Sequence, residues 1–294
     1  MGPEKISPAR SPFIVRKMNR SDIGQCMVLS ADEGWNQTER DWGRLVDNPH
    51  NDCLVAADGR MIVGTATAMN YKNQIAWIGM VLVDKDYRGQ GISKMLLSAL
   101  LKLLKSCRSV KLDATPAGQR VYEKMGFISE YIIYRLTTHS MDNLQPGQTG
   151  IIPQPVLQPD VSDVAKLDSV VFGTDRECLV KSLVKENTGK ALMIKKDNAI
   201  SAFLLGREGR KYQHIGPVSA SSYHDAKALI SSALANLAGQ PVVLDVPADK
   251  DELIRWLSSM GFKVQRHFVR MYLQTNPYPG KKEEQFLICG PEFG

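Results

Sequence analysis

The sequence predicts a mixed α/β fold made of two similar domains in tandem. In the first half, apolar strand patterns alternate with helical patterns, and one strand runs through a glycine-rich turn into a helix. The second half repeats the order of these segments, which indicates a duplication. A chain of 294 residues is long enough for two domains that each bury a core. We expect an arm over 1–12, a first domain over 13–138, a linker over 139–150, a second, degenerate copy over 151–280 and a tail over 281–294, whose apolar run 286–289 should pack against the body.

The elements of the first half follow from local patterns. Asn36-x-x-Glu39 predicts a capping box that opens a helix, and Asn48-Pro49 ends that helix near Val46. Asp58-Gly59 is a favoured turn for a hairpin, and Pro116 suits the first turn of a helix. In order, we expect a strand over 13–18, helices over 21–29 and 36–46, strands over 53–57, 61–67 and 74–83, a helix over 92–105, a strand over 110–114, a helix from 116 and strands after 127.

The turn between residues 83 and 92 indicates an anion site. Gly89 and Gly91 allow a tight turn and a close approach of the backbone to a ligand. The helix that starts at Ile92 points its free N–H groups and its positive dipole end at this turn. Such a helix start binds phosphate or pyrophosphate, and Arg88 and Lys94 add positive charge. An ordinary solvated turn is the alternative for the glycine pair taken alone.

The segments that follow this turn carry a family resemblance. They are Val110–Ala114, Thr115-Pro116-Ala117-Gly118 and Val121–Phe127. With the turn, they resemble the GNAT superfamily of acyl-CoA-dependent N-acetyltransferases over residues 13–137. Arg88, Gly91 and Ser93 fall on the family's phosphate loop, Gln/Arg-x-x-Gly-x-Gly/Ala, where Ser93 departs at the last position. Thr115 stands where the family often has asparagine.

The resemblance implies acetyl-CoA as the cofactor and an amine as the acceptor. It implies that the main chain of Val81 and Val83 pairs with the pantetheine arm, and that an N–H near Met80 or Val81 polarises the thioester carbonyl. Tyr122 occupies the place of the tyrosine that protonates the leaving thiolate; a buried structural tyrosine is the alternative. No cysteine lies in the motif, so we expect direct attack in a ternary complex. The expected cofactor-binding residues are Val81, Val83, Arg88, Gly89, Gln90, Gly91, Ile92, Ser93 and Thr115.

The general base is not evident from the sequence, because the strand over 75–83 carries no acid before Asp84. Candidates are Asp113, Asp32, Glu33 or a water chain, and we take Asp113 as the candidate catalytic acid or base beside Tyr122. A structural role is the alternative for each acid.

The acceptor is expected to enter beside the first pair of helices, where acids and indoles gather. Acids attract a cationic amine, and indole faces stack on it. The candidate residues are Asp32, Glu33, Trp35 and Trp42; the alternative is that Trp42 belongs to the core and that the acids cap helices.

Composition limits the remaining classes. The formal net charge is +6, and basic residues gather at 102–111, but aromatic residues are not interleaved with them, so nucleic acid is an unlikely partner. A polyanionic coenzyme A accounts for this local charge, and a solvated helix face is the alternative. No apolar run approaches the roughly 20 residues that cross a bilayer. The five cysteines form no C-x-x-C pair, which argues against a metal site and for a reducing, cytoplasmic compartment.

The second half lacks the phosphate loop. Residues 218–224 stand in its place, so we expect no coenzyme A there. This half is expected to shape the acceptor site, with Arg207, His214 and Asp245 as its polar candidates, or to form a homodimer contact. The sequence leaves open a small-molecule or a peptide amine as acceptor. It also leaves open a non-catalytic acyl-CoA-binding regulatory module or a polyanion-binding protein.

Overall fold

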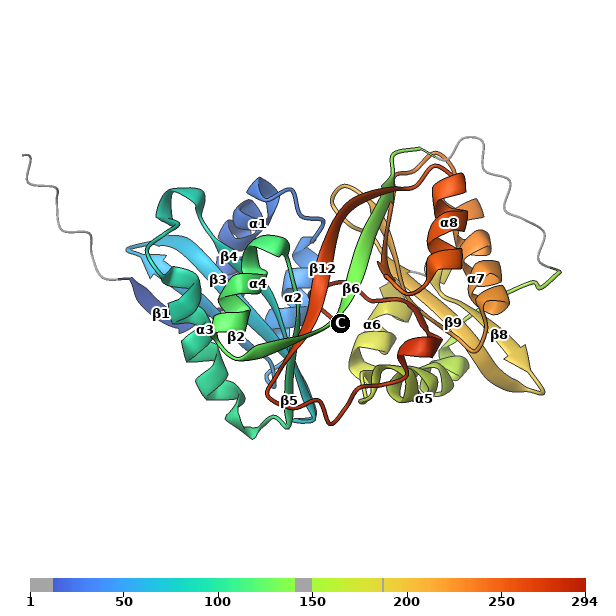
Figure 1. The fold of residues 1–294 in the computed structure, drawn as a ribbon, viewed down its shortest axis with the longest axis horizontal. Helices are drawn as coiled ribbons and strands as arrows, with labels where there is room; N and C mark the ends of the chain where they lie inside the picture. The colour runs from blue at the N-terminus through green and yellow to red at the C-terminus, as the bar shows by residue number, and fades with distance from the viewer. Residues whose placement is uncertain (1–12, 141–149, 187) are drawn as a thin grey trace, which may run out of the picture.

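The computed structural model of the chain describes residues 13–140, 150–186 and 188–294. The predicted arm and most of the predicted linker lie outside these residues. Two α/β lobes stand side by side and are joined by long strands that run between them (Figure 1). No helix in the described part of the chain is long and apolar enough to cross a membrane.

The first lobe contains the elements that the sequence predicts, in the same order. They are β1 (Ile14–Lys17), α1 (Ile23–Asp32), α2 (Glu39–Asp47), β2 (Asp52–Asp58), β3 (Met61–Tyr71), β4 (Ile75–Val83), α3 (Ile92–Leu103), β5 (Ser109–Ala114), α4 (Pro116–Lys124) and β6 (Phe127–Thr138). The amphipathic helix α3 packs its apolar stripe on the sheet. Gly64 of β3 leaves room for this helix, since a Cβ there would lie 2.9 Å from Ile92 Cγ2.

The predicted capping box is wrong by two residues. Thr38 is the N-cap of α2, and its partner in the reciprocal box is Asp41 rather than Glu39. Asn36 serves another purpose, because its side-chain oxygen accepts the main-chain N–H groups of Lys211 and Tyr212, both at 2.9 Å. The loop before α2 is therefore docked on the second lobe.

The second lobe repeats this order. Its elements are β7 (Gln154–Pro155), α5 (Val161–Phe172), α6 (Glu177–Glu186), β8 (Leu192–Lys196), β9 (Ala199–Arg207), β10 (Gln213–Ala220), α7 (Tyr223–Ala235), β11 (Val242–Pro247), α8 (Asp251–Ser259), β12 (Lys263–Leu273) and β13 (Gln285–Leu287). The two Met-Gly-Phe segments end α4 and α8 in the same way: Gly126 and Gly261 both have φ of +91°, the left-handed conformation that favours glycine after a helix.

One continuous sheet joins the lobes, because two strands cross between them. The strand order is β1-β2-β3-β4-β5-β12-β6-β11-β10-β9-β8-β7, and β13 pairs with β10. Strand β12 of the second half pairs with β5 of the first half, while β6 of the first half pairs with β11 of the second. The domain boundaries expected from the sequence thus separate two halves of the chain, but strands of both halves belong to the same sheet.

The tail passes through the centre of the molecule, where the chain ends between the lobes (Figure 1). Its apolar run is buried from Phe286 to Cys289, as the sequence indicates, and Phe293 is buried as well. Trp77 Nε1 donates to the carbonyl of Pro291 at 2.9 Å, and Tyr71 donates to that of Phe293 at 2.8 Å. The tail is therefore a structural part of both lobes.

The basic residues after α3 are not all on a solvated face. Lys111 is buried on β5, and its ammonium donates to the carbonyl of Tyr278 at 2.5 Å. Burial lowers the pKa of Lys111 to about 8. The Lys111 ammonium is therefore bound inside the fold and is not available to a ligand on the surface.

Candidate active site

The site lies where β4 and β5 separate. Their parallel pairing ends at Ile78↔Leu112. Beyond that point the strands line two neighbouring cavities that share several residues: an open groove of about 540 Å³ and a small inner pocket of about 70 Å³. Both cavities are lined by Trp35, Val81, Thr115, Tyr122 and Arg266. The arrangement suits a long ligand in the groove whose end reaches the inner pocket.

A bulge in β4 turns this strand away from β5. The register with β3 shifts between Thr65 and Thr67, and Met80 has φ of +50°, which is uncommon for a residue other than glycine. Two hydroxyls hold the bulge: Thr65 donates to the Met80 carbonyl at 2.6 Å, and Thr67 donates to the Gly79 carbonyl at 3.0 Å. As a result Val81 lines both cavities and Val83 lines the groove.

The glycine turn begins α3 at the outer end of the groove. Gly91 is the N-cap, with φ of +78°, and no side chain caps this helix. The first main-chain bond of the helix is Met95 N–H to the Gly91 carbonyl, at 3.0 Å. The N–H groups just before Met95 therefore have no intrahelical acceptor, as an anion site requires. A Cβ at Gly89 or Gly91 would meet no atom within 4 Å, so the approach to this helix start is open.

The predicted loop residues take different positions around this helix start. Arg88 and Ser93 line the groove, and Arg88 forms an ion pair with Glu33. Gly89 and Gln90 are exposed. Ile92 has its side chain buried in the core, so only its main chain can face a ligand.

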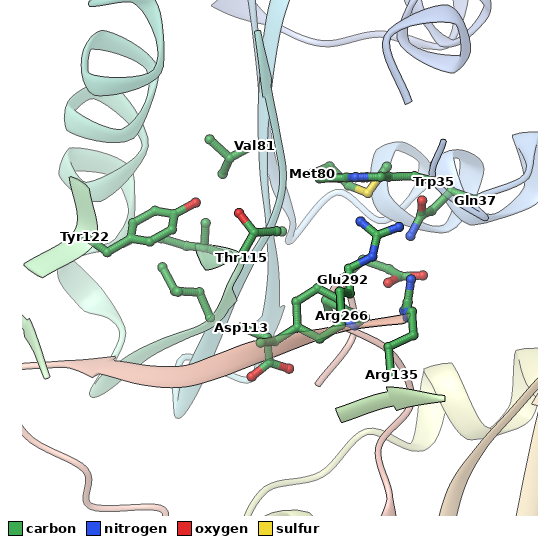
Figure 2. Close-up of a pocket in the computed structure, with 15 residues that line it drawn as sticks. Trp35, Gln37, Met80, Val81, Asp113, Thr115, Tyr122, Arg135, Arg266 and Glu292 are labelled. Carbon is green, nitrogen blue, oxygen red and sulfur yellow. The ribbon is translucent and has the colours of Figure 1, made fainter. Parts of the chain in front are cut away.

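Tyr122 lies between the two cavities. Its hydroxyl points across the gap toward Val81 and Thr115 (Figure 2). Gly118, one turn earlier on α4, makes this possible, because a Cβ there would lie 2.9 Å from Tyr122 Cε2. Burial raises the pKa of Tyr122, so the phenol keeps its proton and can donate it. Thr115 caps α4, with its hydroxyl accepting the Gly118 N–H at 3.3 Å.

The position of Asp113 does not support a catalytic role. Its side chain points away from Tyr122 in Figure 2 and is ion-paired with Arg270, whose Nε and an amino nitrogen lie 2.9 and 3.0 Å from the carboxylate oxygens. Asp113 lines the inner pocket but not the groove. Since β5 is a strand, its successive side chains point to opposite faces, and the Asp113 carboxylate lies on the face opposite the groove. The pair is buried and serves the contact between β5 and β12.

The predicted acceptor residues divide into two sets. Glu33 lines the groove, and Trp35 lines both cavities. Trp42 is fully buried in the core and lines neither cavity, so its position does not support acceptor binding. Asp32 lines neither cavity, and its carbonyl accepts from Lys85 at 3.0 Å. The core alternative is the better description of Trp42.

Five further residues line the inner pocket that sequence reasoning missed: Gln37, Arg135, Arg266, Phe268 and Glu292. Three of them come from the crossing strands β6 and β12, and Glu292 comes from the tail. The buried guanidinium of Arg135 is paired with Asp245 through two hydrogen bonds of 2.7 Å. Arg266 forms no ion pair among the described residues; its Nε donates to Gln265 at 3.3 Å. No local motif marks these positions, because they meet only through the crossed strands and the tail.

The three polar candidates of the second lobe line neither cavity but lie just behind residues that line the inner pocket. Arg207 is buried and ion-paired with Glu292 and Asp41. Asp245 pairs with Arg135, and His214 Nε2 lies 3.6 Å from Asp245. Burial and the neighbouring guanidiniums lower the pKa of His214 well below its usual value, which keeps the imidazole neutral. The second lobe thus supports the inner pocket through buried charge pairs.

In the second lobe the counterpart of the groove is filled by the protein itself. β10 and β11 pair in parallel only over Gln213–Ile215, and β13 then pairs with β10 at Val218↔Leu287. The Ile288 N–H also donates to the Asp245 carbonyl of β11 at 3.0 Å, so the tail lies between the two strands.

The helix start in this second cleft is also occupied. The Ser222 hydroxyl accepts the Asp225 N–H at 3.1 Å and caps α7. The Asp225 carboxylate lies in the first turn of this helix and pairs with Lys196. The second lobe therefore has neither an open cleft nor a free helix start at this place.

Comparisons with known proteins agree with this geometry. The Acetyltransferase (GNAT) family model matches residues 19–127, and the Acetyltransferase (GNAT) domain model matches residues 164–287. The holothin acyltransferase of Pseudoalteromonas sp. is 26% identical over 235 residues, which cover 79% of this chain and 78% of that protein.

Two solved structures share the whole fold. A Pyrococcus horikoshii protein assigned as an acetyltransferase superposes with a TM-score of 0.78 at 20% identity, over 100% of this chain and 99% of that one. A tandem GNAT protein from the clavulanic acid biosynthesis pathway has a TM-score of 0.62 at 14% identity, over 90% of this chain and 99% of that one. The chain belongs to the GNAT superfamily, carries two GNAT domains in tandem and is an acyltransferase.

Proposed function

We propose that the protein transfers an acetyl group from acetyl-CoA to a primary amine, in the site between β4 and β5 of the first lobe. The observation that carries the proposal is the continuity of the groove. It runs from the uncapped start of α3, beside Arg88 and Ser93, to the bulge at Met80 and Tyr122, and then meets the inner pocket. A pyrophosphate at one end and a thioester at the other fit this order.

The residues of the groove would hold the cosubstrate in an extended form. N–H groups at the start of α3, with Arg88 and Ser93, would bind the pyrophosphate, and Arg88 would exchange Glu33 for phosphate. The main chain of Val81 and Val83 lies where β4 has lost its partner β5, so it is available to the pantetheine amides. Thr115 forms the opposite wall. The main-chain N–H near Met80 or Val81 would polarise the thioester carbonyl.

Transfer then needs two proton movements: the amine nitrogen must lose its excess protons, and the leaving thiolate must gain one. The free amine attacks the thioester carbonyl, a C–N bond forms, and the C–S bond breaks. Tyr122 donates its proton to the departing thiolate, and burial raises the pKa of the phenol, so the proton is on the oxygen when the C–S bond breaks. Since no cysteine lines either cavity, a direct attack in a ternary complex is the mechanism that these residues support.

The acceptor is proposed to be a small-molecule or peptide amine that reaches the inner pocket past Trp35. The Pseudoalteromonas relative acts, by its name, on holothin with an unspecified acyl group. That name is the reason to include acyl-CoAs longer than acetyl-CoA in the first assay, whereas the inner-pocket volume of about 70 Å³ favours a short acyl group.

The proposal is tested by calorimetric binding of acetyl-CoA and by release of free coenzyme A thiol with a panel of amines. We expect binding, and turnover with at least one primary amine. Binding without thiol release from any amine would favour a regulatory acyl-CoA-binding module, and absence of binding would refute the proposal.

A further inference from the structure

Only one of the two carboxylate oxygens of Glu292 has a hydrogen-bond partner among the described residues. Glu292 is 1% exposed and lines the inner pocket. Its Oε1 accepts from an amino group of Arg207, while its Oε2 is buried and has no hydrogen-bond partner among the described residues. A buried acceptor without a donor costs free energy, on the order of 1–3 kcal/mol or more for a charged group. This oxygen therefore has the chemistry of a binding site for an N–H donor.

Gln37 supplies a second acceptor of the same kind. It is 5% exposed, lines the same pocket, and its Oε1 is buried without a partner in the described structure. Figure 2 shows Gln37 and Glu292 on the same side of the pocket, across from Tyr122. Both side chains line one small cavity, and their two acceptors without partners match the several N–H bonds of a primary amine or ammonium group.

The backbone of Glu292 lies directly against the bulge of β4. A Cβ at Gly79 would lie 2.9 Å from Glu292 Cα and 3.3 Å from its carbonyl oxygen, so only glycine allows this approach. Gly79 directly precedes Met80, where the thioester carbonyl is proposed to bind. Glu292 thus lies beside the proposed position of the thioester carbonyl, across the pocket from Tyr122 (Figure 2).

The tail is held firmly enough to position a catalytic group. Arg176 is buried, pairs with Asp168, and donates to the carbonyl of Gly294 at 2.8 Å. Arg207 donates to the carbonyl of Cys289 at 2.6 Å. The Gly294 N–H bonds back to the Gly290 carbonyl at 2.9 Å. Contacts on both sides of Glu292 fix its backbone.

Five elements bring titratable groups close to Glu292. His214 of β10, whose imidazole stays neutral, lies with Gly290 beside Oε2 of Glu292. Arg207 of β9 and Asp41 of α2 form one cluster with it, while Arg135 of β6 and Arg266 of β12 line the pocket. Burial raises the pKa of Glu292, and Asp41 adds to this, while Arg207 and Arg135 oppose it. A carboxylate with a raised pKa is a better proton acceptor than an ordinary surface glutamate.

We infer that Glu292 is the proton acceptor for the amine, which it holds together with Gln37. The inference rests on the proposed function. The ammonium group transfers one proton to Oε2 of Glu292, and the resulting free amine attacks the thioester carbonyl. When the C–S bond breaks, Tyr122 protonates the thiolate, and the proton that the nitrogen still carries in excess is returned to Tyr122 through solvent. The proton on Glu292 leaves to solvent before the next turnover.

The test compares Glu292→Gln with wild type on two amines of similar size. Ethylamine is an ammonium ion at neutral pH, whereas trifluoroethylamine is mainly the free base. General-base catalysis contributes on the order of 10²–10⁴-fold. We expect Glu292→Gln to lower kcat/KM for ethylamine by about 10²-fold or more and to lower that for trifluoroethylamine by much less. With ethylamine, kcat/KM of wild type should stop rising with pH once Glu292 is deprotonated, whereas kcat/KM of the variant should keep rising toward the pKa of the amine, because only the free base then reacts.

Glu130→Gln is the matched control, because Glu130 also has a carboxylate oxygen without a hydrogen-bond partner in the described structure but lines neither cavity. It should leave the ratio of the two amine rates as in wild type. Equal losses for both amines in Glu292→Gln, or wild-type rates and pH profile, would overturn the inference while leaving the proposed function intact. Absence of thiol release by wild type with these and all other amines would overturn both.

Discussion

Gly91→Asp is the sharpest perturbation of the anion site. Gly91 has φ of +78° and ψ of 8°, and no atom lies within 4 Å of a Cβ built there. Aspartate can therefore be placed without a clash. The left-handed conformation costs about 1–2 kcal/mol for a residue other than glycine. A carboxylate at a helix start returns about 0.3–1 kcal/mol, so the fold should survive.

Binding should respond much more strongly than stability. A carboxylate about 5 Å from a phosphate charge, at an effective dielectric constant of about 20, is repelled by roughly 3 kcal/mol. Since about 1.4 kcal/mol is a factor of ten, the affinity for acetyl-CoA should fall by at least about 100-fold. The backbone strain is present in the free and the bound protein alike, so it should cancel from the affinity.

Gly91→Ala separates the two effects, because it carries the same strain without the charge. Calorimetry with acetyl-CoA at low salt should show a loss of less than about tenfold for alanine and about 100-fold or more for aspartate, and thermal unfolding should show similar midpoints for both. Equal affinities of the two variants, or wild-type affinity of Gly91→Asp, would refute the assignment of the phosphate site to the start of α3.

Three other predictions concern the same site. Tyr122→Phe should lower kcat by about tenfold or more while the affinity for acetyl-CoA stays within about twofold of wild type; unchanged steady-state turnover would assign Tyr122 a structural role. Calorimetry should give one acetyl-CoA per chain, because β13 fills the second cleft, and a stoichiometry of two would contradict that reading. Arg266→Gln should reduce the preference for acceptors that carry a carboxylate beside the amine, because this guanidinium has no ion-pair partner among the described residues. An unchanged ratio of kcat/KM for an amino acid and its amide would argue against this.

The groove could be predicted from the sequence because its parts are local. Gly89 and Gly91 indicate a tight backbone turn, and the apolar spacing after Ile92 indicates a helix. The proposed anion site can therefore be predicted from residues that are close together in the chain. Thr115, Gly118 and Tyr122 are likewise placed by one helix, α4. For such residues the periodicity of the element determines the direction of each side chain.

The site predictions that the structure does not support depend on contacts between distant segments. Trp42 has an indole of the kind that can stack on an amine acceptor, but its side chain is completely buried in the core. The sequence makes Asp113 a candidate catalytic acid or base, but β12 brings Arg270 beside it and the two side chains form an ion pair. Whether a polar or aromatic side chain is free depends on its partner, and the partner here lies in the other half of the chain.

The sequence by itself determined the duplicated α/β plan, the helix and strand order, and the glycine turn that starts α3, because short-range backbone preferences and periodicity encode these features. Only the tertiary structure decided that β6 and β12 cross between the halves, that β13 closes the second cleft, and that the tail brings Glu292 to the bulge at Met80. These features arise from strand pairing and burial between remote segments. No local pattern records such pairing, since the free energy of each contact depends on which surface the folded chain presents to it.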